Sequence, residues 1–187
     1  GKNELPDLWV LELSSFQLHW TKRLKFDAST VLNITQDHLD WHADMQEYAS
    51  DKFRIFSQHG VCVINRDDAL VANAPVPVES SVMTFGISAP VKANDFGLVR
   101  EGGMLWLAQL VGDQENTGTA RRRKLEEIEL TQKLLMPTEA LQVAGLHNAS
   151  NALAALAVCQ GLGLPMARLL HGLRSYMGEP HRVQHIV

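Results

Sequence analysis

Hydrophobic residues in this chain come in short runs that alternate with segments of helical periodicity. Four of the runs end in polar residues and predict strands, at residues 7–15, 29–35, 60–68 and 81–86. The first three are nearly continuous in apolar residues, which is typical of strands that are covered on both faces of a parallel sheet. Residues 44–60, between the second and third runs, have helical periodicity. This alternation predicts an α/β fold with a mostly parallel sheet flanked by helices.

A different pattern starts near Asp95. Residues 96–110 read as two strands that turn at Glu101-Gly102-Gly103, and a polar stretch follows at 111–124. We expect a small antiparallel β insertion here, with a flexible loop.

Two helices are predicted in the last third of the chain. The first covers residues 147–163, with Asn148 as its N-cap and Gly161 or Gly163 at its end. The second begins with Pro165 at its first helical position.

Composition narrows the class of protein. The chain has 187 residues, of which 45% are hydrophobic and 20% charged, and this is enough to bury the core of one globular domain. The net charge of −4 gives no field that would attract nucleic acid or an anionic membrane. No apolar run approaches the ~20 residues of a membrane-spanning helix. The basic run Arg121–Lys124 precedes several glutamates and reads as a solvated surface stretch.

Cysteine usage and the chain ends add two expectations. Cys62 and Cys159 lie in apolar surroundings, which favours reduced, buried thiols in a cytoplasmic protein. Residue 1 is not methionine, and residues 182–187 read as an interrupted strand. We therefore expect this chain to be a piece of a longer protein.

The chemistry is concentrated where the predicted strands end. Ligands of open parallel sheets bind beyond the carboxyl ends of the strands. Glu12 lies inside an apolar run, so its carboxylate is either paired, bound to a metal, or partly exposed at an edge. The second strand leads into a loop that is dense in ligand-type side chains: Asn33, Thr35, Gln36, Asp37, His38, Asp40 and His42. This loop is either the mouth of an active site or an ordinary solvated loop.

Two kinds of metal site are conceivable in that loop. His38 and His42 are four residues apart, a spacing that zinc sites on helices use, but no third ligand and no CxxC motif accompany them. A site for a hard cation, with one ligand from this loop and Glu12 as another, is the preferred interpretation.

Lys52 stands in the middle of an apolar stripe. The stripe consists of Met45, Tyr48, Ala49, Phe53 and Phe56. Such a lysine usually extends its amine to water. If the amine is instead held near the strand ends, its pKa falls and it becomes reactive as a nucleophile.

Three further residues are candidates for nucleotide contacts. Asn148 and Asn151 lie near the start of a predicted helix, where anionic ligands are favoured, although capping alone also explains Asn148. Arg182 follows Pro180 and could clamp a phosphate. The sequence contains neither a G-x-x-x-x-G-K-[ST] phosphate loop nor a nucleophile elbow.

Five motifs together carry a family resemblance. In chain order, LELSSFQL, LNITQDHLD, YASDKFRIF, GLHNASNALAALA and GEPHR resemble the central ATPase domain of the Mur ligases, between about Leu11 and Arg182. ELSSFQL and PHR resemble the branch of that family that adds D-glutamate. The resemblance implies a central domain of P-loop type that extends over residues 1–187. It also implies that the family's phosphate loop and C-terminal domain lie outside this chain.

The resemblance further implies a reaction. Such ligases use ATP to activate the carboxylate of UDP-N-acetylmuramoyl-L-alanine as an acyl phosphate, and D-glutamate then attacks to form an amide in peptidoglycan precursor synthesis. ATP and Mg²⁺ are the implied cofactors, in a cytoplasmic, monomeric enzyme with no nucleic-acid or membrane partner.

Residue roles follow from the same resemblance. Glu12 and His38 would hold magnesium, together with Lys52 after its carbamylation by carbon dioxide. The matching positions on the muramoyl side are Ser14, Ser15, Gln17 and Asn33, and those on the nucleotide side are Asn148, Asn151 and Arg182.

Three alternatives stay open. Two are enzymes, namely a sister Mur ligase with another amino acid and a relative similar to folylpolyglutamate synthase. The third is a nucleotide-binding domain without turnover. We expect the chain alone to be inactive, because it lacks the phosphate loop and the C-terminal domain.

Overall fold

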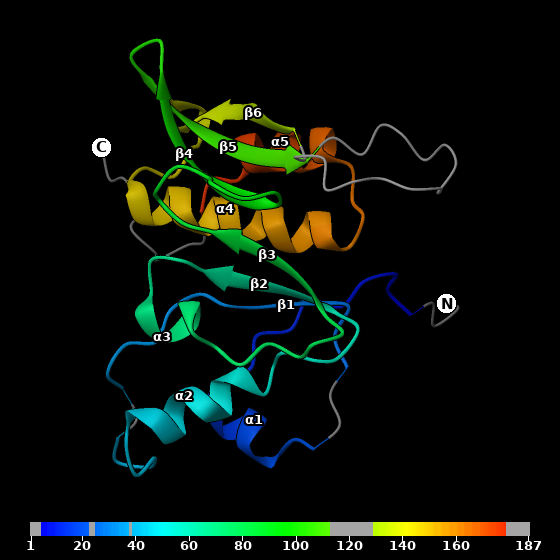
Figure 1. Ribbon diagram of the computed structural model, residues 1–187, viewed down its shortest axis with the longest axis vertical. Coiled ribbons are helices and arrows are strands. Elements are labelled where there is room, and N and C mark those ends of the chain that lie inside the picture. Colours follow the sequence, from blue (N-terminus) through cyan, green and yellow to red (C-terminus); the bar gives the residue numbers. More distant parts are fainter. Residues whose placement is uncertain (1–4, 23–24, 38, 113–128, 179–187) are drawn as a thin grey trace.

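The structure is a computed structural model that describes residues 5–22, 25–37, 39–112 and 129–178. Its elements are arranged as one mixed sheet with helices on both sides (Figure 1). The strands are β1 (Ala28–Val31), β2 (Val61–Asn65), β3 (Ser81–Phe85), β4 (Asp95–Glu101), β5 (Met104–Gly112) and β6 (Leu130–Pro137). The helices are α1 (Ser15–Trp20), α2 (Met45–Phe53), α3 (Ala69–Ala72), α4 (Leu146–Gly161) and α5 (Met166–Ser175), with a 3₁₀ turn η1 at Thr138–Ala140.

The six strands lie in the order in which they occur in the chain. β1 to β4 pair in parallel, and β4, β5 and β6 pair antiparallel. The predicted α/β fold, with a mostly parallel sheet flanked by helices, is confirmed. The antiparallel strands were expected as an insertion, and they continue the same sheet because β4 pairs with β3. The loop expected at 111–124 lies largely outside the described residues.

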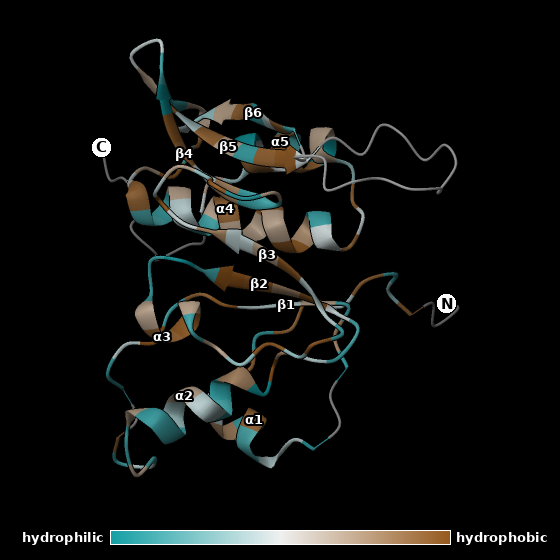
Figure 2. Cartoon of the chain, viewed as in Figure 1, coloured by the Kyte–Doolittle hydropathy of each residue, from teal (hydrophilic) through white to brown (hydrophobic). Residues whose placement is uncertain are grey.

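Two hydrophobic cores cover the two faces of the sheet. Successive residues of β2 point to opposite faces, so Val63 joins the core under α4, whereas Cys62 and Ile64 join the core under α2 and α3. Figure 2 shows hydrophobic colour along β2, β5 and α4. A strand with both faces buried needs apolar residues at consecutive positions, which explains the continuous run in the sequence.

The predicted hairpin is confirmed at its turn. Gly102 and Gly103, between β4 and β5, both have positive φ, at 60° and 81°. A two-residue turn with both φ values positive matches the twist of the flanking strands, and glycine adopts it without steric cost. The hairpin could therefore be located from its two glycines.

The strand predicted at residues 7–15 is wrong. No described strand pairs with residues 7–13, and Trp9 and Val10 are 66% and 88% exposed. The extended run ends at Ser14 because Ser14 and Gln17 cap each other and start α1 at Ser15. An apolar pattern indicates a buried environment but does not supply the partner strand that a ladder requires.

The predicted start of α4 is also wrong. The helix begins at Leu146 with Gly145 as its N-cap, at φ 102°, so Asn148 lies inside the first turn. The predicted end holds, since α4 stops at Gly161 and Gly163 follows with φ 76°. Pro165 is the N-cap of α5, one position before its predicted place.

Two remaining expectations concern the cysteines and the membrane. Cys62 is buried and Cys159 half-buried, and no disulfide joins them. Burial raises the pKa of both thiols. Among the described residues, no helix has both the length and the apolar character needed to cross a bilayer.

A pair of glycine substitutions tests the packing of the sheet. A Cβ at Gly97 in β4 would lie 2.3 Å from the carbonyl oxygen of Ser88, whereas a Cβ at Gly172 in α5 would meet nothing within 4 Å. We expect Gly97→Ala to lower the free energy of unfolding by about 1–3 kcal/mol. Gly172→Ala, the matched control, should raise it by up to about 1 kcal/mol, because alanine favours a helix interior. Urea unfolding of both variants measures the difference, and equal stabilities would contradict the close approach.

Candidate active site

The loops that follow β1 and β2 are tied together at one edge of the sheet. Asn65, at the end of β2, donates from Nδ2 to the carbonyl oxygen of Leu32 at 2.7 Å. Asp68 caps α3, and its Oδ2 also accepts from the backbone N–H of Ile34 at 2.7 Å. Both side chains form hydrogen bonds with backbone groups of residues 32–34, so they fix the beginning of the loop that carries Asn33 and Asp37.

Lys52 lies on α2 within electrostatic reach of two carboxylates. Its amine is half-buried, and burial lowers its pKa, while the charges of Asp37 and Glu12 act in the opposite direction. The amine also lies 5.4 Å from the centre of the Tyr48 ring, a favourable cation–π distance. Glu12 therefore acts electrostatically on the Lys52 amine, while His38 lies outside the described residues.

The charges that act on Lys52 are of the kind that a hard cation prefers. Glu12 and Asp37 both carry carboxylates that act electrostatically on the same amine, and magnesium prefers carboxylate oxygen. Within the described ranges, no three His, Cys, Asp or Glu side chains are already grouped around one point. The ligand set of Glu12, His38 and modified Lys52 therefore stays a prediction.

The first turn of α1 holds three of the predicted substrate residues. Ser14 and Gln17 form a reciprocal capping box, with Ser14 N donating to Gln17 Oε1 at 2.8 Å and Gln17 N donating to Ser14 Oγ at 3.3 Å. Both are exposed, as is Asn33 after β1. Ser15 differs because it is only 2% exposed, and its Oγ lies 2.9 Å from His42 Nε2.

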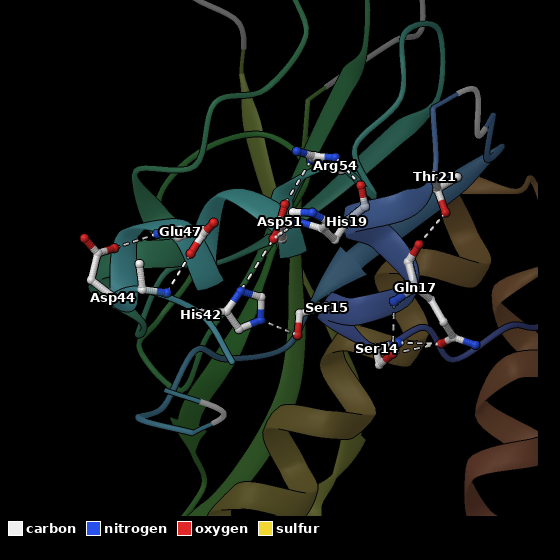
Figure 3. A network of polar contacts seen from close by, with 11 residues as sticks. Ser14, Ser15, Gln17, His19, Thr21, His42, Asp44, Glu47, Asp51 and Arg54 are labelled. Carbon is white, nitrogen blue, oxygen red and sulfur yellow. Dashed lines mark hydrogen bonds and ion pairs between the residues drawn. The ribbon is translucent and has the colours of Figure 1, made fainter. Parts of the chain in front are cut away.

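His42 belongs to a buried polar cluster between α1 and α2 (Figure 3). The centre of the cluster is Asp51, which is 2% exposed. Asp51 Oδ2 lies 2.8 Å from His19 Nδ1, and its Oδ1 lies 3.1 Å from Arg54 Nε. His42 Nδ1 lies 3.5 Å from Asp51 Oδ2, which is a polar contact but too long for a good hydrogen bond.

The sequence patterns did not predict this cluster. Ser15, His42 and Asp51 have no motif spacing, and only the packing of α1 on α2 brings them together. The zinc hypothesis for His38 and His42 gains nothing from the structure, because the Nε2 atom of His42 already contacts Ser15 inside the protein.

The predicted nucleotide residues are distributed over α4 and the end of the chain. Asn151 is exposed on α4. Asn148 donates from Nδ2 to the carbonyl oxygen of Ala144 at 2.8 Å and so supports the start of the helix from inside its first turn. Arg182 and the basic run Arg121–Lys124 lie outside the described residues.

A cavity of about 370 Å³ opens beside the start of α4. Its walls come from β5, η1 and the residues around Gly145, and none of the described candidate residues lines it. Its walls are mainly apolar, with Thr138 and Glu139 as their polar members, so the candidate site remains at the loops around Lys52.

Comparison with known proteins gives a consistent result. The profile of the Mur ligase middle domain matches residues 2–159. The chain is 50% identical over 188 residues to a UDP-N-acetylmuramoylalanine–D-glutamate ligase of Paraburkholderia phymatum, and the match covers 96% of this chain. It is 51% identical over 190 residues to the enzyme of the same name from Cupriavidus pinatubonensis, again over 96% of this chain.

A solved structure agrees on the fold. A pseudomurein peptide ligase type C from Methanothermus fervidus superposes with a TM-score of 0.53 at 24% identity, over 86% of this chain and 36% of that one. The chain spans 37% and 38% of the lengths of the two D-glutamate ligases.

The lowered pKa of Lys52 predicts how stability depends on pH. The unfolded chain holds this proton more tightly than the native state, so the contribution of Lys52 to stability rises as the pH increases from the lowered pKa toward the ordinary value of 10.5. Lys52→Met should therefore be more stable than the wild type at pH 7, and this advantage should shrink as the pH approaches 10.5.

Lys52→Arg is the matched control, since a guanidinium stays charged throughout this range. The wild type should gain stability relative to Lys52→Arg as the pH rises. Thermal unfolding from pH 7 to 10.5 measures both differences. Differences that do not change with pH would show that burial does not weaken the affinity of the amine for its proton.

Proposed function

This chain belongs to the Mur ligase family, and from that premise we propose that it forms the central ATP-binding domain of a ligase that adds D-glutamate to UDP-N-acetylmuramoyl-L-alanine. One observation carries the proposal: over 96% of its length, this chain is 50% and 51% identical to two ligases of that name. Because the chain spans less than two fifths of their length, the reaction is assigned to the longer protein that contains it.

The proposed reaction has two steps. A carboxylate oxygen of the muramoyl-alanine attacks the γ-phosphorus of ATP, and ADP leaves as the acyl phosphate forms. The amine of D-glutamate then attacks the acyl carbon, an amide forms, and phosphate leaves. Both steps bring anionic groups together, so the site must supply cations and oriented donors.

Magnesium fits the donor chemistry around Lys52. We assign Glu12, His38 and carbamylated Lys52 as its ligands, and the bound ion would neutralise charge on the phosphoryl oxygens. Carbamylation joins the neutral amine to carbon dioxide, gives a carbamate and releases a proton. The lowered pKa of Lys52 supports this assignment, because it raises the fraction of neutral amine.

The remaining residues divide between the two substrates. Ser14, Gln17 and Asn33 are exposed and could donate to or accept from the muramoyl substrate, while Ser15 lies behind them. On the nucleotide side we assign Asn148, Asn151 and Arg182. The proposed enzyme is a cytoplasmic monomer with no nucleic-acid or membrane partner.

The alternatives differ in their substrates. A sister Mur ligase would use another amino acid, a folylpolyglutamate synthase-like enzyme would use a folate, and a domain without turnover would bind nucleotide only. The two relatives at 50% and 51% identity favour D-glutamate. A lysine with a lowered pKa, on which two carboxylates act electrostatically, favours a working site over a silent one.

Phosphate release tests the function directly. The full-length protein, incubated with ATP, magnesium and UDP-N-acetylmuramoyl-L-alanine, should release phosphate in step with amide formation only when D-glutamate is added. L-Glutamate, other amino acids and a folate acceptor serve as controls. The 187-residue chain alone should show no turnover, because it spans only 37% of the length of such ligases. Release that requires another amino acid would favour the sister-ligase alternative.

Asn151 offers a test of the nucleotide side. Asn151→Ala in the full-length protein should raise the KM for ATP with little change in melting temperature, because the side chain is exposed on α4. Asn151→Asp keeps the shape but removes the amide donors, so it should weaken ATP binding at least as much. A large loss of melting temperature with an unchanged KM would make Asn151 structural.

A further inference from the structure

The two helices that carry the proposed site are joined by one buried set of contacts. α1 packs mainly on α2. The first turn of α1 holds Ser14 and Gln17 at the surface, and the last turn of α2 holds Lys52. The position of the substrate residues relative to Lys52 therefore depends on what fixes α1 to α2.

A chain of three polar side chains crosses this junction. The Oγ atom of Ser15 on α1 lies 2.9 Å from Nε2 of His42, and Nδ1 of His42 lies 3.5 Å from Oδ2 of Asp51 on α2. All three residues are 2% exposed. The carboxylate beside Nδ1 favours the tautomer with its proton there, and Nε2 then accepts the hydrogen of the Ser15 hydroxyl.

Asp51 anchors the α2 end of this chain. His19 Nδ1 and Arg54 Nε contact its two oxygens, and Arg54 Nη1 also donates to the carbonyl oxygen of His19 at 2.5 Å. α1 is thus held at its first turn by Ser15 and at its last turn by His19.

Aromatic rings hold the imidazole in place. The His42 ring stacks on Phe16, with ring centres 5.7 Å apart and an interplanar angle of 10°, and the centre of the Trp41 ring lies 4.5 Å from that of His42 at 79°. The Tyr48 ring lies 5.1 Å from His42, and the amine of Lys52 lies 5.4 Å from the same Tyr48 ring. The orientation of His42 therefore affects the surface against which Lys52 rests.

A hydrolytic role for the three residues does not fit their burial. A serine nucleophile must reach a substrate carbonyl, and Ser15 is 2% exposed beneath the surface residues of α1. The contacts hold side chains in place and leave no room for a substrate beside Oγ.

We propose that Ser15, His42 and Asp51 act as a positioning unit for the ligase reaction, one that sets the muramoyl-binding turn of α1 against Lys52 on α2. The inference rests on the proposed function and adds residues to it. None of the three touches substrate in this role. Their effect passes through Ser14 and Gln17 on one side and through Tyr48 and Lys52 on the other.

Kinetics of the full-length protein test the unit. His42→Leu and Asp51→Asn should raise the KM for UDP-N-acetylmuramoyl-L-alanine or lower kcat, by about tenfold to 100-fold for supporting residues of this kind, while the KM for ATP stays within about twofold. His42→Gln should recover most of the loss, because its amide reaches the place of Nε2, whereas His42→Asn should not.

Asp95→Asn is the matched control. Asp95 is also an aspartate with 2% exposure, and it accepts from Thr84 Oγ1 at 2.5 Å and from the N–H of Lys92 at 2.9 Å. It lies at the start of β4, three strands from β1 in the sheet. Its substitution should lower the melting temperature and leave both KM values unchanged. Ser15→Ala removes a single hydroxyl and provides the test if His42→Leu does not fold.

The outcomes separate the two proposals. If the wild type is an active ligase and the His42, Asp51 and Ser15 variants lose only melting temperature, as Asp95→Asn does, the positioning role is overturned and the function stands. If the wild type has no ligase turnover with D-glutamate, the proposed function fails and the role assigned to the unit fails with it. A rise in the muramoyl KM or a fall in kcat, with the KM for ATP unchanged and with rescue by glutamine at position 42, supports both.

Discussion

The alternation of β2 between two hydrophobic cores is the constraint on which the site depends. Val63 faces α4, and its neighbours Cys62 and Ile64 face α2 and α3. Since both faces of the strand are buried, its register against β1 and β3 cannot slip by one residue without turning every side chain to the wrong core. The same register places the ends of β1 and β2 at one edge, where Asn65 and Asp68 fasten the loop that leads to Asp37.

The acidic side chains around the candidate site have two different uses. Asp68 and Asp51 are occupied by backbone N–H groups or by cationic partners, so they contribute to the geometry. The charges of Glu12 and Asp37 instead raise the pKa of the Lys52 amine. A buried carboxylate without a partner would be costly, and the structure accordingly keeps its most buried aspartates fully engaged and leaves Glu12 exposed.

Sequence patterns could predict the helices, strands and turns whose signals lie within one short segment of the chain. The continuous apolar run of β2, the glycine pair at 102 and 103 and the stripe of α2 each correspond to one element. Residues 7–15 and Asn148 could not be read correctly, because the first depends on a partner strand and the second on which of several polar residues starts the helix. Lys52 was recognised from its stripe, whereas the contact of Ser15 with His42 joins residues 27 positions apart and left no local signal.

The position of Lys52 explains why the junction between α1 and α2 matters. Burial weakens the hold of the amine on its proton, and the carboxylates of Glu12 and Asp37 strengthen it. The balance between these opposing effects changes with distances of a few ångströms. Glu12 comes from the segment just before α1, and Lys52 comes from α2. Any movement of α1 on α2 would therefore alter the pKa of the lysine as well as the place of the proposed substrate residues. A buried connection between the two helices would therefore keep the pKa of Lys52 constant. Asp51, the neighbour of Lys52 in the sequence, provides such a connection through His19 and His42.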